Sequence, residues 1–362
     1  MADARARRVL MASPGGRRGK GGMASLVVYL AEALPKRLPH VAIEIVDSYG
    51  PGAFRAMPFY FARAAVRVAW ACLWRRADLV HLHMSHYGSV TRKLILAAIA
   101  QGLGVRTVVH LHGSDFDANY NGLPRWQQKL VVAVLKRAAR VIAIGTFWRD
   151  FAVGTLGLDP GRVALIHNGA PAVPWRARAS GAAPRLLMLG ELGPRKGTPE
   201  LLAALASPAL KDKAWSAVLA GNGPVERYRA EAAALGLGAR VALPGWQGAA
   251  EVRALLDEAD VFVLPSRQEG LPIAILEAMA CGAAVVATPV GAIPDAILDG
   301  ETGLIVPPGD AAALARALAR LIDDPALRAR LAQNARRRFA AMFTIERTAD
   351  AVAALYRELG VA

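Results

Sequence analysis

The most informative stretch of the sequence is SRQEGLPIAILEAMACG, residues 266–282. Glu269 lies in a predicted strand-to-helix loop, and Pro272 opens the helix that follows, because proline is favoured in a first helical turn. Glu277 comes eight residues after Glu269, two turns into that helix. At about 1.5 Å per residue, the two carboxylates are about 12 Å apart along the helix axis. This spacing is too long for one catalytic pair and fits the two polar ends of an extended ligand.

The backbone between the two glutamates favours an anion. The first N–H groups of a helix have no partner within the helix, and the helix dipole is positive at this end. The N–H groups of residues 270–273 are therefore suited to an anion such as a diphosphate. A second interpretation stays open, in which Glu269 only caps the helix and Glu277 is a solvated surface residue.

Other loops in the second half offer phosphate-binding groups. The loop GELGPRKG follows a predicted strand and presents Arg195 and Lys196. The loop GNGP, which contains Asn222 and Gly223, follows the next strand, and its glycines let a ligand approach the backbone closely. Because these loops follow consecutive strands, we expect them at one edge of a sheet.

Short aliphatic or β-branched runs alternate with helix-like segments along the whole chain. This alternation predicts βαβ units and parallel sheets, which define an α/β fold. The first series of predicted strands is residues 8–12, 41–46, 78–82, 107–111, 140–144 and 163–166, and the second is residues 185–189, 217–220, 240–243, 261–264 and 283–287.

The alternation stops at residues 171–184, where Pro, Ala, Gly and Arg occur without a period. We interpret this stretch as a linker between two Rossmann-like domains, residues 1–178 and residues 179–343. In open α/β sheets, ligands bind beyond the carboxyl ends of the strands. Two such domains are therefore expected to face each other across a cleft.

Composition excludes several classes of protein. The 362 residues are 54% hydrophobic, which is too much for a disordered chain, and the 34 Gly and 22 Pro show no fibrous repeat. The net charge of +15 is uneven: residues 1–178 hold 25 Lys and Arg against 9 Asp and Glu, whereas residues 179–362 hold 19 against 20. All of the basic excess lies in the first half.

The sequence favours the cytoplasm. Cys72 and Cys281 are the two cysteines of a long chain and imply no disulfide framework. Residues 9–12 are too short an apolar run for a signal peptide. The longest uncharged stretch, residues 278–294, contains two glycines and two prolines, so no membrane-spanning helix is expected.

The second half resembles the retaining GT-B glycosyltransferases of family four, the glycosyl transferases group 1. The resemblance rests on the GxxxxxKG loop, GNGP, LPGW, the two glutamates, EAMACG and DGETGLIVPPGD at residues 299–310. The first half matches less densely, through a glycine-rich first loop, HGSD at residues 112–115 and HNGA at residues 167–170. The resemblance implies a GT-B fold, with the acceptor in the N-terminal domain, the nucleotide sugar in the C-terminal domain, and a final helix over residues 344–362 that crosses back to the N-terminal domain.

The resemblance also implies a role for each candidate residue. His112, Lys196 and Glu269 are the catalytic candidates: His112 against the transferred sugar, Lys196 on the diphosphate, and Glu269 on the sugar hydroxyls. Glu277 is implied to bind the ribose hydroxyls, and Gly21 or Gly22 to let the first loop close over the phosphates. The donor-binding set is Gly21, Gly22, Arg195, Lys196, Asn222, Gly223, Gly270, Leu271, Pro272 and Glu277.

The family usually retains the anomeric configuration, with the leaving phosphate helping to deprotonate the acceptor. No protein nucleophile, cofactor or metal is then required. One position departs from the family pattern, because Glu191 stands where an arginine usually follows the glycine that opens the GxxxxxKG loop. Since a carboxylate cannot replace a guanidinium on a diphosphate, either Arg195 takes over this role or phosphate binding is weaker.

Two nucleotide-binding motifs fit poorly. The stretch GGRRGK at residues 15–20 is one residue short of a P-loop, and Lys20 is followed by Gly21 rather than by Ser or Thr. The glycines of this loop, with Asp47 at the end of the second strand, also suggest a dinucleotide fingerprint. The first glycine comes too late after its strand for that motif.

A metal site has weak support. The histidines share strand faces in two HxH pairs, but no set of carboxylates accompanies them, so core or cleft-lining histidines are favoured. Asp115 and Asp117 form a DxD motif, which we interpret as a structural loop feature in this fold. The histidines concerned are His81, His83, His86, His110 and His112.

The basic first half allows three interpretations. Nucleic-acid binding would require a recognisable module or a groove lined with stacking aromatics, and neither is visible. A solvated basic face is the second. The third is contact with an anionic membrane or a phosphate-bearing acceptor, favoured by residues 54–76 (FRAMPFYFARAAVRVAWACLWRR), where large apolar residues are mixed with arginines. A surface helix that packs on its own sheet explains the same stretch.

We therefore predict a retaining hexosyltransferase that uses a UDP- or GDP-sugar as donor and a saccharide or lipid-linked saccharide as acceptor. Its role is expected in surface polysaccharide, exopolysaccharide or glycolipid synthesis. The predicted location is the cytoplasm, with peripheral contact at the inner face of the membrane and no nucleic-acid partner. The alternative is a non-catalytic subunit that binds a nucleotide sugar within a glycosyltransferase complex.

Overall fold

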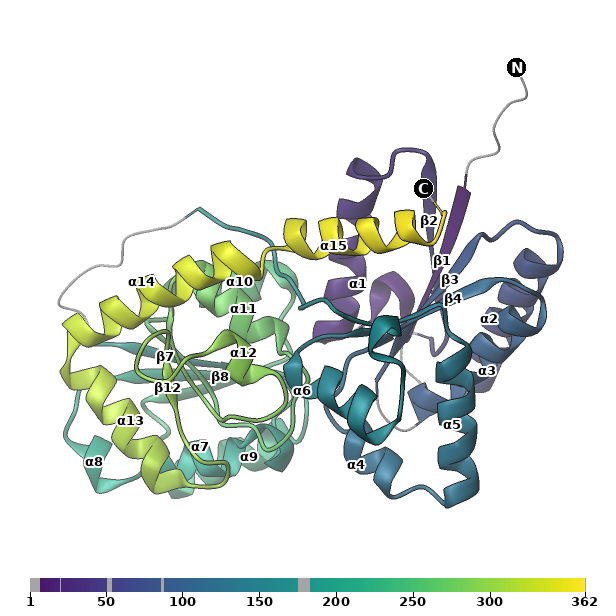
Figure 1. Ribbon diagram of the computed structural model, residues 1–362. Helices are drawn as coiled ribbons and strands as arrows, with labels where there is room; N and C mark the ends of the chain where they lie inside the picture. The colour runs from purple at the N-terminus through teal and green to yellow at the C-terminus, as the bar shows by residue number, and fades with distance from the viewer. Residues whose placement is uncertain (1–6, 20, 51–53, 86–87, 175–182, 362) are drawn as a thin grey trace. The chain divides into compact units, whose positions relative to one another are not determined.

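The computed structural model describes residues 7–19, 21–50, 54–85, 88–174 and 183–361. The chain divides into two compact units, which we call the first and second domains (Figure 1). The first contains Met1–Gly169 and Ile345–Ala362, and the second contains Ala170–Thr344. Residues 175–182 of the predicted linker lie outside the described residues.

Both domains are built on a six-stranded parallel sheet. The strand order is β2-β1-β3-β4-β5-β6 in the first domain and β12-β11-β10-β7-β8-β9 in the second. The strands are β1 Arg7–Ser13, β2 Val41–Asp47, β3 Leu79–Met84, β4 Arg106–Leu111, β5 Arg140–Ala143, β6 Val163–Leu165, β7 Arg185–Leu189, β8 Ser216–Ala220, β9 Val241–Gly245, β10 Val261–Leu264, β11 Ala284–Ala287 and β12 Leu304–Ile305.

Helices connect the strands, as parallel pairing requires. Figure 1 shows α10, α11 and α14 on one face of the second sheet and α7, α9 and α13 on the other. The α-helices are α1 Gly22–Ala33, α2 Met57–Leu73, α3 Gly88–Gly102, α4 Phe116–Asn121, α5 Arg125–Arg137, α6 Thr146–Asp150, α7 Thr198–Leu205, α8 Pro208–Lys211, α9 Val225–Ala234, α10 Ala249–Glu258, α11 Ile273–Cys281, α12 Ile293–Ala296, α13 Ala311–Asp323, α14 Pro325–Met342 and α15 Ile345–Glu358.

The sheets are covered on both faces, which explains their continuous apolar strands. In the second domain, Phe262 and Val263 of β10 are fully buried, as are Val285 and Val286 of β11. The carboxyl ends of the strands, where the chain leaves this apolar core, carry the polar loops that the sequence singled out.

The last helix belongs to the first domain, although it comes at the end of the chain. Tyr356 of α15 is fully buried, and its hydroxyl lies 2.6 Å from Nδ1 of His81 on β3. Arg37 forms an ion pair of 2.6 Å with Asp350 at the surface of the same contact. In the described part of the chain, no helix combines the length and the apolar character needed to span a bilayer.

Candidate active site

Two catalytic candidates of the second domain contact each other. Lys196 ends a short turn after β7, Glu269 follows β10, and Lys196 Nζ donates to Glu269 Oε1 at 2.5 Å. The Ser266 hydroxyl donates to the same oxygen at 2.7 Å. Glu269 is only 6% exposed, and a buried carboxylate is stable only when it is paired. Both of these hydrogen bonds end on Oε1 of the carboxylate.

Glycines let the loops after β7 and β8 pack against each other. A Cβ atom on Gly221 would lie 1.6 Å from the carbonyl oxygen of Gly190, and one on Gly223 would lie 2.4 Å from that of Leu192. The Leu192 N–H donates to the carbonyl oxygen of Asn222 at 2.7 Å. Asn222 and Gly223 are therefore held beside the Lys196 loop, with both residues exposed.

A third loop fixes the start of α11. A Cβ atom on Gly291 would lie 2.1 Å from the carbonyl oxygen of Glu269. The Ala292 N–H donates to the carbonyl oxygen of Gly270 at 2.8 Å. Glycine at position 291 therefore lets its loop pack closely against the segment that carries Glu269. Gly270, Leu271 and Pro272 are all buried here, immediately before the first residue of α11.

The remaining donor-binding candidates surround this centre. Glu277 lies on the second turn of α11 and is partly exposed. The helix begins only at Ile273, so the predicted helical spacing applies from there and not from Glu269. Arg195 precedes Lys196 with its side chain partly exposed, and its carbonyl oxygen accepts from the Arg267 N–H at 2.8 Å. Glu191, the departure from the family pattern, is exposed.

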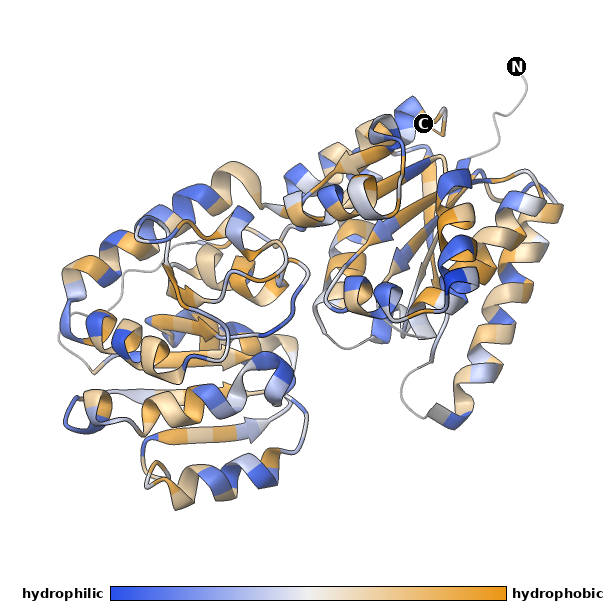
Figure 2. Cartoon of the chain, turned by 60° about the horizontal axis from the view of Figure 1, so that its bottom comes forward, coloured by the Kyte–Doolittle hydropathy of each residue, from blue (hydrophilic) through white to orange (hydrophobic). Residues whose placement is uncertain are grey.

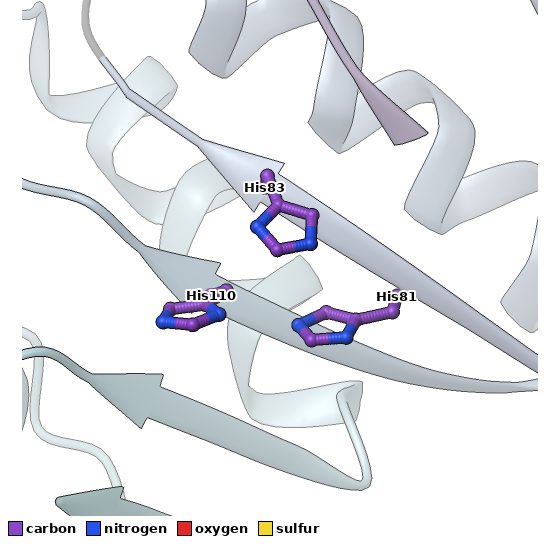
Figure 3. A group of neighbouring side chains, drawn as sticks. All are labelled: His81, His83 and His110. Atoms are coloured by element: carbon purple, nitrogen blue, oxygen red, sulfur yellow. The ribbon is translucent and has the colours of Figure 1, made fainter. Parts of the chain in front are cut away.

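In the first domain, His112 follows β4 and joins a group of buried imidazoles. Nε2 of His112 lies 2.9 Å from Nδ1 of His83. Figure 3 shows His81 and His83 of β3 and His110 of β4 close together. The ring of His112 stacks on that of His110, and all four imidazoles are buried. Burial lowers the pKa of His112 to about 3, and the nearby charge on Lys93 acts in the same direction. His112 is therefore a neutral hydrogen-bonding group at physiological pH.

Three of these histidines could hold a metal ion. His81, His83 and His110 each place a ring nitrogen within 4.8 Å of the others, as Figure 3 shows. Two of their nitrogens already have partners, Tyr356 on His81 and His112 on His83. His86, which the sequence grouped with them, lies outside the described residues. Of the DxD pair, Asp115 is buried before α4 and Asp117 lies within it.

The glycine-rich first loop ends at α1. Gly21 has a φ of +91° and caps the helix, which starts at Gly22, and both glycines are exposed. The loop is tied down at its other end, where the Gly15 N–H donates to Asp47 Oδ1 at 2.9 Å. Lys20, the lysine of the imperfect P-loop, lies outside the described residues.

Sequence reasoning missed the groups that support the candidates. Ser266 appeared only as part of the quoted stretch, yet it fixes the Glu269 carboxylate. Gly291 was not among the candidate residues, yet a Cβ atom there would clash with the carbonyl oxygen of Glu269. The positive φ of +58° at Gly291 depends on tertiary structure, so only the glycine itself was visible as a signal.

Known proteins resemble the chain along both domains. Alpha-D-kanosaminyltransferase of Streptomyces kanamyceticus is 35% identical over 179 residues, or 49% of this chain and 46% of that protein. The lipopolysaccharide core biosynthesis mannosyltransferase LpcC of Rhizobium leguminosarum is 35% identical over 176 residues, or 47% of this chain and 49% of that protein. These matches span about half the length of each relative.

The fold of a solved structure aligns with nearly the whole of this chain. HepE of Anabaena, in complex with UDP-glucose, aligns with 97% of this chain and 99% of its own, with a TM-score of 0.74 and 20% identity. Residues 3–169 match the model of the glycosyl transferase 4-like domain, and residues 174–338 match the model of the glycosyl transferases group 1. With both domains matched in this way, the chain belongs to the glycosyl transferases group 1 family.

Proposed function

We propose that the protein transfers a hexose from a UDP- or GDP-sugar to a saccharide or lipid-linked saccharide, with retention at the anomeric carbon. The observation that carries this proposal is the contact between Lys196 and Glu269 at the start of α11. In this contact, Lys196 provides a cation that can bind a diphosphate, and Glu269 provides a carboxylate that can bind sugar hydroxyls. Both lie at a helix N-terminus, which favours anions.

The residues divide the donor between them. Lys196 and Arg195 stabilise negative charge on the departing diphosphate, together with the first N–H groups of α11. Glu269 Oε2 accepts from hydroxyls of the sugar, and Glu277 accepts from those of the ribose. Because Lys196 has three N–H donors, it can keep its bond to Glu269 while it binds a phosphate oxygen.

The proposed reaction needs no protein nucleophile. The acceptor oxygen bonds to the anomeric carbon on the face from which the phosphate oxygen departs, and that phosphate oxygen takes the acceptor proton. The protein contributes alignment of the two substrates and stabilisation of the leaving charge. Neutral His112 supplies a hydrogen bond to the sugar, and neither a metal ion nor a cofactor takes part.

The relatives support this choice of donor and pathway. Two are named as a kanosaminyltransferase and a lipopolysaccharide core mannosyltransferase, and HepE was solved with UDP-glucose. Each of these names concerns sugar transfer or a sugar nucleotide. We extend that chemistry to this chain and place it in surface polysaccharide or glycolipid synthesis in the cytoplasm.

We further propose that α2 contacts an anionic membrane. Phe59, Val66 and Leu73 lie on one side of α2 and are 69%, 69% and 63% exposed, whereas the buried side carries small residues such as Ala64 and Ala71. Figure 2 shows hydrophobic residues along this helix. The segment over residues 54–76 has five arginines and no acidic residue. Exposed apolar and basic side chains together are typical of a helix that lies in a lipid interface.

A non-catalytic subunit is the second candidate, and Glu191 favours it. This carboxylate is exposed in the loop that carries Lys196, where it would repel a diphosphate. Such a subunit would bind a nucleotide sugar without cleaving it. The two candidates therefore differ in turnover and not in donor binding.

The test is donor turnover by the isolated protein. A thermal-shift panel of UDP- and GDP-sugars, with and without EDTA, first identifies the donor, because a ligand stabilises the protein that binds it. Hydrolysis and transfer are then measured with that donor and with saccharide or lipid-linked acceptors. We expect turnover that EDTA does not reduce. Donor binding without any turnover would favour the subunit, and turnover that depends on an added metal would contradict the proposed chemistry.

A further inference from the structure

The first domain contains two buried cations that have no acidic partner. Lys93 on α3 is fully buried, and its Nζ donates to the neutral hydroxyl of Ser48 at 2.6 Å. Arg92, beside it, is 8% exposed and packs with its guanidinium 5.0 Å from the ring of Tyr49. Among the described residues, neither side chain has a carboxylate oxygen within 4.0 Å. Buried lysines and arginines are rarely found without such a partner.

Further polar groups at the same place lack partners. The Arg92 Nε atom is buried and makes no hydrogen bond with the described residues. The same holds for the hydroxyl of Ser89, which lies one turn before Arg92 and Lys93 on the same face of α3. The hydroxyl of Ser13, at the end of β1, is also buried without a partner. Several buried hydrogen-bond donors therefore have no acceptor among the described residues.

The fold gathers these groups at a ligand-binding edge. Ser13 and Ser48 stand at the carboxyl ends of β1 and β2, and the Ser48 N–H donates to the Ser13 carbonyl oxygen at 3.0 Å. Ligands in open α/β sheets bind beyond such ends. Ser89 lies in the first turn of α3, where the helix dipole favours negative charge. Two cations, three hydroxyls and a helix N-terminus all favour an anion.

One carboxylate lies nearby, and it is already occupied. Asp47 Oδ1 accepts from the N–H groups of Gly15, Tyr49 and Gly50, at 2.8–2.9 Å. The pKa of Lys93 lies well below its usual value, mainly because of burial and also because of Arg92, while Asp47 acts against this shift. Asp47 therefore does not offset the effect of burial on Lys93, and a bound anion would favour the charged form of this lysine.

We propose that these groups form a binding site for a phosphate group on the acceptor, contributed by Ser13, Ser48, Ser89, Arg92 and Lys93. A phosphate offers more acceptor oxygens than a carboxylate, and so it can satisfy more of these donors. Ser13 ends β1, which pairs with β3, and β3 carries His83, whose Nδ1 lies 2.9 Å from Nε2 of His112, the residue implied to contact the sugar. The assignment to the acceptor rests on the proposed function, whereas the anion site itself does not.

Direct titration tests the site. The probes are inorganic phosphate, a sugar monophosphate, and an alkyl phosphate in neutral detergent micelles. Wild type is compared with Lys93→Met, which removes the charge and keeps the side-chain length, and with Lys129→Met, which removes an exposed lysine from α5 of the same domain. We expect Lys93→Met to bind the phosphate esters at least about tenfold more weakly than wild type, and Lys129→Met to bind as wild type does.

The three probes distinguish the possible sources of the phosphate group. Preference for the sugar monophosphate assigns a soluble phosphorylated acceptor, and preference for the alkyl phosphate assigns a lipid phosphate. UDP is titrated in parallel, and we expect Lys93→Met to leave its binding unchanged. Loss of UDP binding in that variant would assign the cations to the donor and overturn the proposal. A protein that binds phosphate esters but turns over no nucleotide sugar would keep the site and refute the proposed function.

Folding of the variants is checked by thermal melting. We expect Lys93→Met to melt at or above the wild-type temperature, because it removes a buried amine whose hydrogen-bond partner is only the neutral Ser48 hydroxyl. We expect phosphate to raise the melting temperature of wild type and of Lys129→Met, but not that of Lys93→Met. If this variant does not fold, Arg92→Gln and Ser89→Ala replace it, with the same expected loss of phosphate binding. Unchanged binding of phosphate esters in the folded variants, or no binding by wild type, would overturn the proposal.

Discussion

At the scale of single residues, Glu269 illustrates how a buried charge is prepared for a ligand. Lys196 and Ser266 hold one of its carboxylate oxygens, at 2.5 and 2.7 Å. These two groups offset the desolvation free energy of the buried carboxylate, without the need for a bound donor. In the proposed reaction, a sugar hydroxyl would meet a hydrogen-bond acceptor that is already in position.

We expect Glu269→Gln to lower kcat by about 100- to 1000-fold, because the amide cannot balance Lys196 or accept as strongly from the sugar. Steady-state kinetics with the identified donor measures this loss. Lys213→Met is the control, since it breaks a lysine–carboxylate pair of 2.6 Å with Asp323 on the surface of the same domain. A kcat for Glu269→Gln within about threefold of wild type would contradict the assigned role.

The buried histidines predict a pH dependence of stability. Burial lowers the pKa of His81 and of His112 to about 3, from an ordinary value of 6.5. The folded state therefore binds fewer protons than the unfolded state between these values, so stability is lost as the pH falls below 6.5. Each such group contributes a slope of up to about 1.4 kcal/mol per pH unit.

Hydrogen exchange of the β3 and β4 amides, followed from pH 7 to pH 4.5, measures this effect in the first domain. We expect protection to decrease towards low pH, and to decrease less steeply in His110→Phe, because the pKa of His110 is also lowered by burial. The exposed His40→Phe serves as the control. Protection free energies that stay constant over this range would be incompatible with neutral, buried imidazoles.

At the scale of elements, the sequence predicted the strands better than the contacts between loops. All eleven predicted strands are present, with ends shifted by at most two residues, because a parallel sheet covered on both faces demands short continuous apolar runs. β12 was not predicted, since Leu304–Ile305 is too short to show any pattern. The pairing of Gly291 with Glu269 and the burial of Lys93 were also missed, because both depend on chain segments that are distant in sequence.

Gly291 tests how the loop before α11 is held. Gly291 and Gly300 have φ values of +58° and +71°, so alanine costs about 1–2 kcal/mol of backbone strain at either position. At Gly291 the added Cβ would also clash with the Glu269 carbonyl oxygen, whereas at Gly300 nothing lies within 4 Å. We expect Gly291→Ala to weaken donor binding and Gly300→Ala to leave it intact. Equal donor affinities in the two variants would show that this packing does not position the site.

Helix α2 tests the membrane proposal. Replacing Phe59, Leu73 and Trp74 together by serine removes three exposed side chains without altering the buried face of the helix. We expect sedimentation with phosphatidylglycerol vesicles to weaken at least about 100-fold, because each side chain contributes about 1.5–3 kcal/mol when it leaves water. The control replaces Leu235, an exposed residue of the second domain, by serine. If wild type does not bind these vesicles, or if the triple variant binds them equally well, this face of α2 does not contact the membrane.

At the scale of the whole molecule, each domain carries one part of the proposed chemistry. Residues 179–362 carry nearly equal numbers of basic and acidic residues, and the second domain holds the Lys196–Glu269 centre. The first carries the basic excess, the exposed face of α2, the neutral His112 and the buried cations of α3. The chain returns to the first domain through α15, whose Tyr356 contacts the histidine group. This division matches a donor in one domain and an acceptor in the other.

The most direct test of the account is an equilibrium titration of UDP and GDP into wild type, Lys196→Met, Glu277→Gln and Lys213→Met. We predict that wild type binds one of the two nucleotides, and that Lys213→Met binds the same nucleotide with the same affinity. We also predict that Lys196→Met loses affinity by at least about tenfold, because an ammonium–phosphate contact is lost, and that Glu277→Gln weakens binding through the ribose. Wild-type affinity in both Lys196→Met and Glu277→Gln would contradict the claim that a nucleotide diphosphate lies at the start of α11.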